Sequence, residues 1–244
     1  MKVRFLLRLH FEITFFSFYI QLSEFKMPET NQFIIHQITD VNSADFHYCL
    51  SIYREAFPPN EKQPEQIICE RVEKKKSVLY CLKYNSKIVG ITLLWDFKNS
   101  KFQLLDYFAI IEEQRKIGMG SFFFKEISNL VNQTGKRLIM EVEHPAYGNN
   151  KSERKRRIDF YIKNGSFILN HVPYILPPLD GTIPTEMFLL IAPGSEGEVF
   201  NRTQIIDLIN RIYLELYERD KNDFLLNKFI DKLSEEIILT TNYE

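Results

Sequence analysis

Hydrophobic and polar positions divide the first half of the chain into short segments with the periodicity of a strand or a helix. The segments expected are a strand over 33–41, helices over 45–57 and 64–76, and strands over 78–84, 88–97 and 102–110. The first helix should be capped at Asn42 or Ser43 and should end at the Pro58-Pro59 pair. Short polar turns join the last three strands, which is typical of an antiparallel meander.

The pattern changes after this meander, because helices and strands now alternate. The segments expected are helices over 118–131 and 153–164 and strands over 137–142, 167–175 and 186–191. Gly165 supplies a C-cap for the second of these helices. A meander followed by crossover units predicts an α+β fold with a mixed, mostly antiparallel central sheet flanked by helices.

A boundary is expected after the last of these strands, where Pro193-Gly194 and Gly197 interrupt the pattern. Beyond it, apolar positions recur at helical spacing over 203–217 and 223–238, which predicts a C-terminal helical pair. The apolar stripes of these helices require burial against the sheet, the pocket or a partner.

The first 26 residues differ from the rest of the chain. They have a basic start and an aromatic run, but His10 and Glu12 interrupt the apolar stretch, which is too broken to span a membrane. We expect an extension outside the core, and a weak signal or membrane-associating segment stays open as the alternative. The predicted organisation is an extension over 1–26, a domain over 27–194 and a C-terminal helical extension over 195–244.

Composition narrows the class of protein only slightly. The 244 residues carry a formal net charge of −1, which gives no argument for binding nucleic acid or an anionic membrane. Cys49, Cys69 and Cys81 lack metal-ligand spacing, so no metal site is expected. They are more typical of buried thiols in a reducing cytoplasm than of a catalytic Cys–His pair.

The segment that carries the chemistry is the strand, loop and helix over 103–131. Its loop contains Arg115, Gly118 and Gly120 just before the helix. Glycines allow a phosphate to approach the backbone closely, and the unpaired amides of a helix N-terminus bind anions. A P-loop would need Gly-Lys-Ser/Thr, and a dinucleotide fingerprint would need glycine where Phe123 stands, so neither motif fits. A plain helix start with a tight turn is the structural alternative.

The order of elements and the Arg-x-x-Gly-x-Gly placement resemble the GNAT superfamily of acetyl-CoA-dependent N-acetyltransferases. The phosphate-binding signature of that family is Arg/Gln-x-x-Gly-x-Gly/Ala, and Arg115, Gly118 and Gly120 match it. The similarity covers roughly residues 33–192. A later segment is similar to the family's Tyr-x-x-x-Gly-Phe, except that Ser166 stands between Gly and Phe, which puts the following strand register in doubt.

The resemblance implies acetyl-CoA as the acyl donor and a splay between the fourth and fifth strands at their carboxyl ends. The pantetheine arm would pair with the fourth strand, and the pyrophosphate would lie on amides of the loop and helix. The cofactor-binding residues expected on this basis are Phe108, Ala109, Ile110, Arg115, Lys116, Ile117, Gly118, Met119, Gly120 and Ser121.

Candidates for the acid–base chemistry follow on the next strand and helix. Strand alternation places Glu141 and Glu143 on one face, where either could take the proton of an attacking amine or attract a cationic acceptor. Ion pairing with arginines of the next helix is the structural alternative. The resemblance implies that Tyr161 is the acid near the CoA sulfur, and its alternative role is that of an aromatic core residue.

Two further groups are weaker base candidates. His144 follows the strand and is more typical of a loop residue. Asp106 is expected to share a face of its strand with Leu104 and Phe108.

Together these features predict an N-acetyltransferase that transfers an acetyl group from acetyl-CoA to a primary amine by direct attack in a ternary complex. A non-catalytic acyl-CoA-binding regulatory module on the same fold is the alternative, because it would share the cradle and differ only in the proton-handling groups. The acceptor is a small molecule or a peptide, and polyamines, aminoglycosides, amino acids and protein N-termini all stay open. A homodimer through the sheet edge or the C-terminal helices is one arrangement that the sequence allows.

Overall fold

The computed structural model describes residues 33–115, 118–148, 150–178 and 185–243. The extension predicted over 1–26 and the predicted loop residues Lys116 and Ile117 lie outside this described part. The chain divides into two compact units, 1–34 and 35–244, and the site belongs to the second unit. Among the described helices, none is both long enough and apolar enough to cross a membrane.

The first half of the described chain follows the predicted order of elements. These are β1 (Phe33–Ile38), α2 (Ala44–Ala56), the 3₁₀ turn η2 (Pro59–Glu61), α3 (Glu65–Glu73), β2 (Ser77–Tyr84), β3 (Lys87–Asp96) and β4 (Phe102–Ile110). Ser43 caps α2 by accepting a hydrogen bond from the amide of Phe46 at 3.2 Å, as predicted. The strands β2, β3 and β4 pair antiparallel and form the expected meander.

The second half contains the expected crossover units, with one shorter strand. Its elements are η3 (Glu112–Gln114), α4 (Met119–Gln133), β5 (Arg137–Glu143), α5 (Lys151–Lys163), β6 (Phe167–Leu169), β7 (Ile175–Leu176) and β8 (Thr185–Ala192). Gly165 follows α5 with φ +91°, the left-handed conformation that ends many helices. The strand predicted over 167–175 breaks after Leu169, because His171 has φ +57° and Pro173 cannot donate a ladder hydrogen bond.

The C-terminal segment differs from the predicted helical pair. It contains β9 (Val199–Asn201), α6 (Arg202–Arg211), the π-helical turn η4 (Ile212–Leu216), α7 (Phe224–Ile230) and β10 (Glu236–Thr240). The helix predicted over 223–238 is wrong beyond Ile230, because β10 pairs with β6 and β9. Its side chains alternate as in a strand, since Ile237 and Leu239 are buried and Ile238 is exposed.

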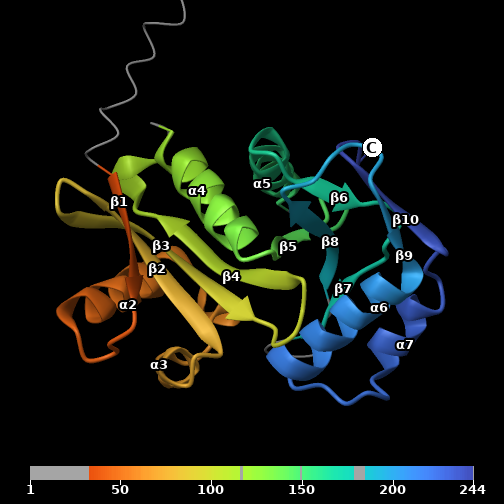
Figure 1. The fold of residues 1–244 in the computed structure, drawn as a ribbon, viewed down its shortest axis with the longest axis horizontal. Helices are drawn as coiled ribbons and strands as arrows, with labels where there is room; N and C mark the ends of the chain where they lie inside the picture. The colour runs from red at the N-terminus through yellow and green to blue at the C-terminus, as the bar shows by residue number, and fades with distance from the viewer. Residues whose placement is uncertain (1–32, 116–117, 149, 179–184, 244) are drawn as a thin grey trace, which may run out of the picture. The chain divides into compact units, whose positions relative to one another are not determined.

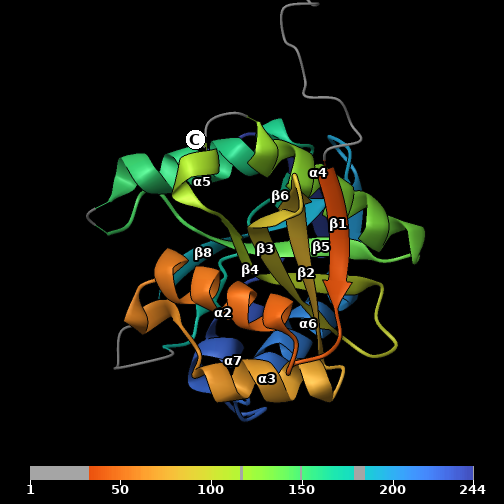
Figure 2. The ribbon, with the colours of Figure 1, turned by 90° about the vertical axis from the view of Figure 1, so that its left-hand side faces the viewer.

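The described strands form one ten-stranded sheet in the order β1-β2-β3-β4-β5-β8-β6-β10-β9, with β7 beside β8. Strands β4 and β5 pair in parallel. The pairs β2–β3 and β3–β4 on one side of them are antiparallel, and so are the pairs β5–β8, β8–β6, β6–β10 and β10–β9 on the other side. The helices α4 and α5 cover one face, whereas α2, α3, α6 and α7 lie on the other (Figure 1 and Figure 2). This is the predicted mixed, mostly antiparallel sheet flanked by helices.

The C-terminal segment shares a hydrophobic core with the sheet. Leu208 of α6 and Tyr213 of η4 are fully buried in one cluster with Ile139 of β5 and Leu189 of β8. A second cluster joins α2 and α3 to β2, β3 and β4. The segment from β9 to β10 is therefore held to the sheet by packing as well as by strand pairing.

The shared core predicts that truncating Leu208 destabilises the whole chain. Leu208→Ala should lower the free energy of unfolding by about 2–5 kcal/mol, because the side chain is fully buried and its loss leaves a cavity. Leu214→Ala is the matched control, since Leu214 is 40% exposed on the same segment, and it should change stability by less than about 1 kcal/mol. Urea unfolding of the full chain measures both, and equal small effects would contradict a shared core.

Candidate active site

The strands β4 and β5 are paired over only four residues. Their register begins with Phe102 opposite Arg137 and ends with Leu105 opposite Met140. Beyond this point β4 continues to Ile110 against β3, and β5 continues to Glu143 against β8. In the described part of the chain no strand pairing joins these two ends, which is the splay that the resemblance implied.

A β-bulge in β4 centres on Asp106, the residue without a partner in the register with β3. The extra residue reverses the alternation of the side chains that follow. Phe108 therefore faces α4 and stacks on Phe123, with ring centroids 5.4 Å apart. Asp106 faces α3 and accepts a hydrogen bond from Arg71 Nη1 at 3.3 Å. The prediction that Asp106 and Phe108 share a face is wrong for this reason.

The start of α4 has backbone and charge features that suit a bound anion. Gly118 precedes the helix with φ +85°, a left-handed conformation that glycine adopts without strain. The first turn carries no acidic side chain. The amides of Met119, Gly120 and Ser121 have no acceptor one turn earlier in the helix, so they are available to a phosphate oxygen.

Arg115 joins this helix start to the end of β4. Its Nε donates to the carbonyl oxygen of Ile110 at 2.9 Å, while the side chain is exposed and keeps its charge at the loop. The strand residues Phe108, Ala109 and Ile110 pair with β3 along one edge only. The structure thus brings the two sets of predicted cofactor residues, on the strand and on the helix start, next to each other.

Glu141 lies half-buried on β5, between two phenols. Tyr174 donates to its Oε1, and Tyr217 donates to its Oε2 at 2.7 Å. Burial raises the pKa of Glu141 to about 7, although the two hydrogen bonds from the phenols act in the opposite direction. A carboxyl with a pKa near neutrality suits a general base. The sequence predicted neither tyrosine as a partner of Glu141.

Asp106 is a second carboxyl with a raised pKa. Burial raises its pKa to about 6, and the charge of Arg71 acts against that rise. The two side chains are 12% and 10% exposed, so the ion pair is largely removed from solvent. The charge of Asp106 adds to the rise in the pKa of Glu141, although burial of Glu141 is the larger cause.

Glu143 has the ion-paired arrangement that the sequence left open as the alternative. Its Oε1 lies 2.8 Å from Arg154 Nη2, and its Oε2 lies 3.0 Å from Arg157 Nη1. Both oxygens are therefore occupied by guanidinium groups of α5. Glu143 and Glu141 share one strand face, but their surroundings differ.

Tyr161 is buried on α5, and its ring meets that of Phe124 edge-on at 5.2 Å. Burial raises the pKa of its phenol to about 12, so the phenol is protonated at neutral pH, as a proton donor must be. His144 stacks on Phe188 at 4.2 Å, and its Nδ1 accepts a hydrogen bond from the amide of Ala146. Burial lowers the pKa of His144.

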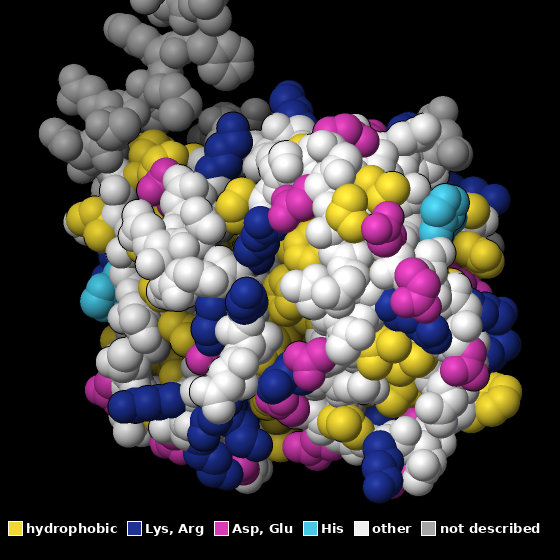
Figure 3. All heavy atoms as spheres, turned by 45° about the vertical axis from the view of Figure 1, so that its right-hand side comes forward, with side chains coloured by type: hydrophobic (Ala, Val, Ile, Leu, Met, Phe, Trp, Pro, Cys, Tyr) yellow, Lys and Arg dark blue, Asp and Glu magenta, His cyan; other side chains and the backbone are white. Residues whose placement is uncertain are grey.

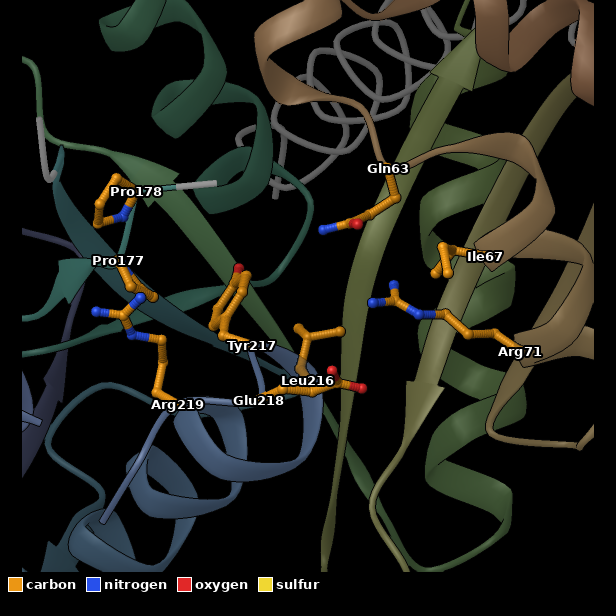
Figure 4. A pocket seen from close by; sticks show the side chains of 9 residues that line it. All are labelled: Gln63, Ile67, Arg71, Pro177, Pro178, Leu216, Tyr217, Glu218 and Arg219. Atoms are coloured by element: carbon orange, nitrogen blue, oxygen red, sulfur yellow. The ribbon is translucent and has the colours of Figure 1, made fainter. Parts of the chain in front are cut away.

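The structure contains a cavity of about 300 Å³ on the side of the sheet where α3 and η4 lie (Figure 4). Its lining residues come from the region of α3, from the prolines after β7, and from the end of η4 with the segment that follows it: Gln63, Ile67, Arg71, Pro177, Pro178, Leu216, Tyr217, Glu218 and Arg219. Arg71 and Tyr217 each line the cavity and hydrogen-bond a site carboxyl, Asp106 and Glu141 respectively.

Charge on the molecular surface is mixed in sign. On the face shown in Figure 3, basic and acidic side chains are interspersed around a hollow with apolar side chains at its floor. No broad field of one sign dominates that face.

The described structure has the fold of the GNAT acetyltransferases. It is similar to a GNAT-family protein from Bacteroides thetaiotaomicron, with a TM-score of 0.64 and 19% identity over 77% of this chain and 99% of that one. It is also similar to the spermidine N-acetyltransferase from Vibrio cholerae solved with CoA and spermine, with a TM-score of 0.50 and 9% identity over 66% and 95% of the two chains. By sequence, no family model and no curated protein matches the chain.

The helix start predicts that Gly118 matters for acetyl-CoA binding through its backbone. Gly118→Ala places a Cβ in the left-handed region, at a cost of roughly 1–2 kcal/mol, and should weaken binding by about tenfold. Gly135→Ala is the matched control, because Gly135 has φ +76° just after the other end of α4, where the same backbone strain should leave acetyl-CoA binding unchanged. Titration calorimetry measures both affinities, and unchanged binding by Gly118→Ala would remove this loop from the cofactor site.

Proposed function

We propose that the protein is an N-acetyltransferase that transfers an acetyl group from acetyl-CoA to a primary amine by direct attack in a ternary complex. The observation that carries this proposal is Glu141, a carboxyl with a pKa near neutrality, placed where β4 and β5 separate and linked through Tyr217 to a cavity. The GNAT fold supports the same conclusion.

The acyl donor fits the residues present on the α4 side of the sheet. The free edge of β4 over 108–110 would hold the pantetheine arm, and the amides of Met119, Gly120 and Ser121 would hold the pyrophosphate. Acetyl-CoA supplies the reactive thioester. Gly118 and Gly120 keep side chains away from the phosphate positions, and Arg115 keeps a positive charge beside them.

The acceptor amine approaches from the opposite side, where the cavity lies. Glu141 takes one proton from the amine nitrogen, while Tyr174 and Tyr217 hold its two oxygens in place. The nitrogen forms a bond to the acetyl carbon and the carbon–sulfur bond breaks. Tyr161 gives its phenolic proton to the departing sulfur, which keeps the proton balance. Asp106 is the second candidate for the base, because its pKa is also raised.

The base assignment predicts a large and specific effect of Glu141→Gln. This variant should lose about 10²–10⁴-fold in kcat/KM while it still binds acetyl-CoA, because only proton transfer is removed. Glu143→Gln is the matched control on the same strand face, and its kcat/KM should fall far less. Thiol release against an amine panel, with mass detection of acetylated products, measures both. Acetyl-CoA binding without transfer to any amine in the wild type would favour the regulatory module instead.

The raised pKa of Glu141 predicts a pH profile. A base must be ionised before it can accept a proton, so kcat/KM should rise with pH through an apparent pKa near 7, separate from the titration of the amine. That inflection should be missing in Glu141→Gln.

The same pKa predicts that the free energy of unfolding falls as the pH rises. A raised carboxyl pKa means that the folded state, but not the unfolded state, holds the proton between about pH 4.5 and 7. Wild-type stability relative to Glu141→Gln should therefore fall over this range, and a flat difference would contradict the assignment.

A further inference from the structure

Arg219 lies at one end of the cavity, next to Pro177 and Tyr217 (Figure 4). Its Nε donates to Asp223 Oδ2 at 2.8 Å. Asp223 is fixed in turn, because its Oδ1 accepts hydrogen bonds from the amides of Leu225 and Leu226 at 2.8 and 3.2 Å. The guanidinium is therefore anchored through one nitrogen to the start of α7.

This anchoring leaves most of the guanidinium unused. Among the described residues, no hydrogen-bond acceptor contacts either terminal nitrogen of Arg219. The Asp223 side chain is 7% exposed and the Arg219 side chain is 39% exposed, so the carboxylate is buried while the cation stays accessible. A guanidinium held in this way presents a planar pair of donors that matches a carboxylate or a phosphate.

The other charged residues of the cavity have different roles. Arg71, at the opposite end, is already paired with Asp106, and its guanidinium lies 5.0 Å from the centre of the Trp95 ring. Glu218 is exposed at the rim. Arg71 thus uses one terminal nitrogen to hold Asp106. Within the described part of the chain, Arg219 is instead held through Nε alone and has both terminal nitrogens unused beside Tyr217, the phenol that reaches Glu141.

We propose that the acceptor is a compact amine that also carries an oxyanion, a carboxylate or a phosphate, and that Arg219 binds this oxyanion. The inference rests on the proposed function. The amine end would point toward Glu141 and Asp106, and the anionic end toward Arg219. A volume of about 300 Å³ is at the small end for ligand sites, which favours a short zwitterion. A linear polyamine would bring a second ammonium against Arg219, where like charges repel.

A matched set of acceptors tests the inference on the full chain. The compounds 3-aminopropanoate, 2-aminoethyl phosphate, propylamine and 1,3-diaminopropane share an aminoethyl unit and end in a carboxylate, a phosphate, a methyl group and an ammonium. Leucine and 3-methylbutylamine extend the comparison to α-amino acids. For at least one oxyanion-bearing amine, kcat/KM should be about tenfold higher than for the matched amine that lacks the oxyanion. Comparison of 3-aminopropanoate with 2-aminoethyl phosphate shows which oxyanion is preferred.

Variants then assign the preference to Arg219. Arg219→Gln should abolish the preference for an oxyanion by raising KM for the oxyanion-bearing amine. Arg219→Lys keeps the positive charge but lacks the planar pair of N–H donors, so it should retain part of the preference. Arg211→Gln is the control, because Arg211 lies on the same segment, pairs with Asp207 and Glu215 and does not line the cavity. It should keep the full preference. Thermal unfolding of each variant separates misfolding from a loss of binding.

The outcomes separate this inference from the proposed function. Efficient acetylation of propylamine or 1,3-diaminopropane without an oxyanion preference would overturn the inference and leave the acetyltransferase standing. A preference that persists in Arg219→Gln would also overturn it. Calorimetric binding of the oxyanion-bearing amines that depends on Arg219, without acetyl transfer to any of them, would support the anion site and contradict the proposed function. The absence of both binding and transfer would overturn the inference.

Discussion

The short parallel contact between β4 and β5 is the constraint on which the rest of the site depends. Parallel neighbours require a crossover, and α4 supplies it, so the N-terminus of α4 follows the carboxyl end of β4. Because pairing ends at Leu105 and Met140, the backbone beyond is open toward the splay. The bulge at Asp106 lies at the end of this pairing and turns its carboxyl toward α3. One local geometry thus places the N-terminus of α4, the proposed phosphate site, on one face of the sheet and a carboxyl on the other.

The C-terminal segment completes the site that this geometry opens. Tyr217 follows the π-helical turn η4, an irregularity often found at functional positions, and its phenol reaches Glu141. The buried side chains of α6 and η4 pack against β5 and β8, while β10 extends the sheet beside β6. The segment is therefore fixed at both ends, which a side chain needs if it is to hold a carboxyl in one orientation.

Most helices and strands were predictable because periodicity, caps and turn residues act locally. The two main errors arose where a distant part of the chain decides the outcome. Residues 236–240 continue an apolar stretch that suits a helix as well, and only the pairing with β6 and β9 makes them a strand. The bulge at Asp106 leaves no signal in a single sequence, because the count of residues against β3 determines it.

The candidate site was likewise predictable where local patterns define it and unpredictable where distant segments meet. Gly118 and Gly120 belong to a local motif at the start of a helix, and periodicity alone placed Glu141 and Glu143 on a shared face. Tyr174 and Tyr217 lie 33 and 76 residues from Glu141 in the sequence, so no local pattern relates them to it. Arg219 was missed for a similar reason, since only the folded chain brings it to the cavity that Arg71 also lines.

The surroundings of Glu141 and Glu143 explain why two identical side chains on one strand face are suited to different roles. Guanidinium groups of Arg154 and Arg157 lie against the two oxygens of Glu143, which is therefore held in ion pairs. Neutral phenols occupy the oxygens of Glu141 and orient them without adding a charge. A base must gain a proton during the reaction, and burial among neutral groups favours the protonated form that results. The phenols partly offset that effect, which leaves a carboxyl able both to ionise near neutral pH and to accept a proton.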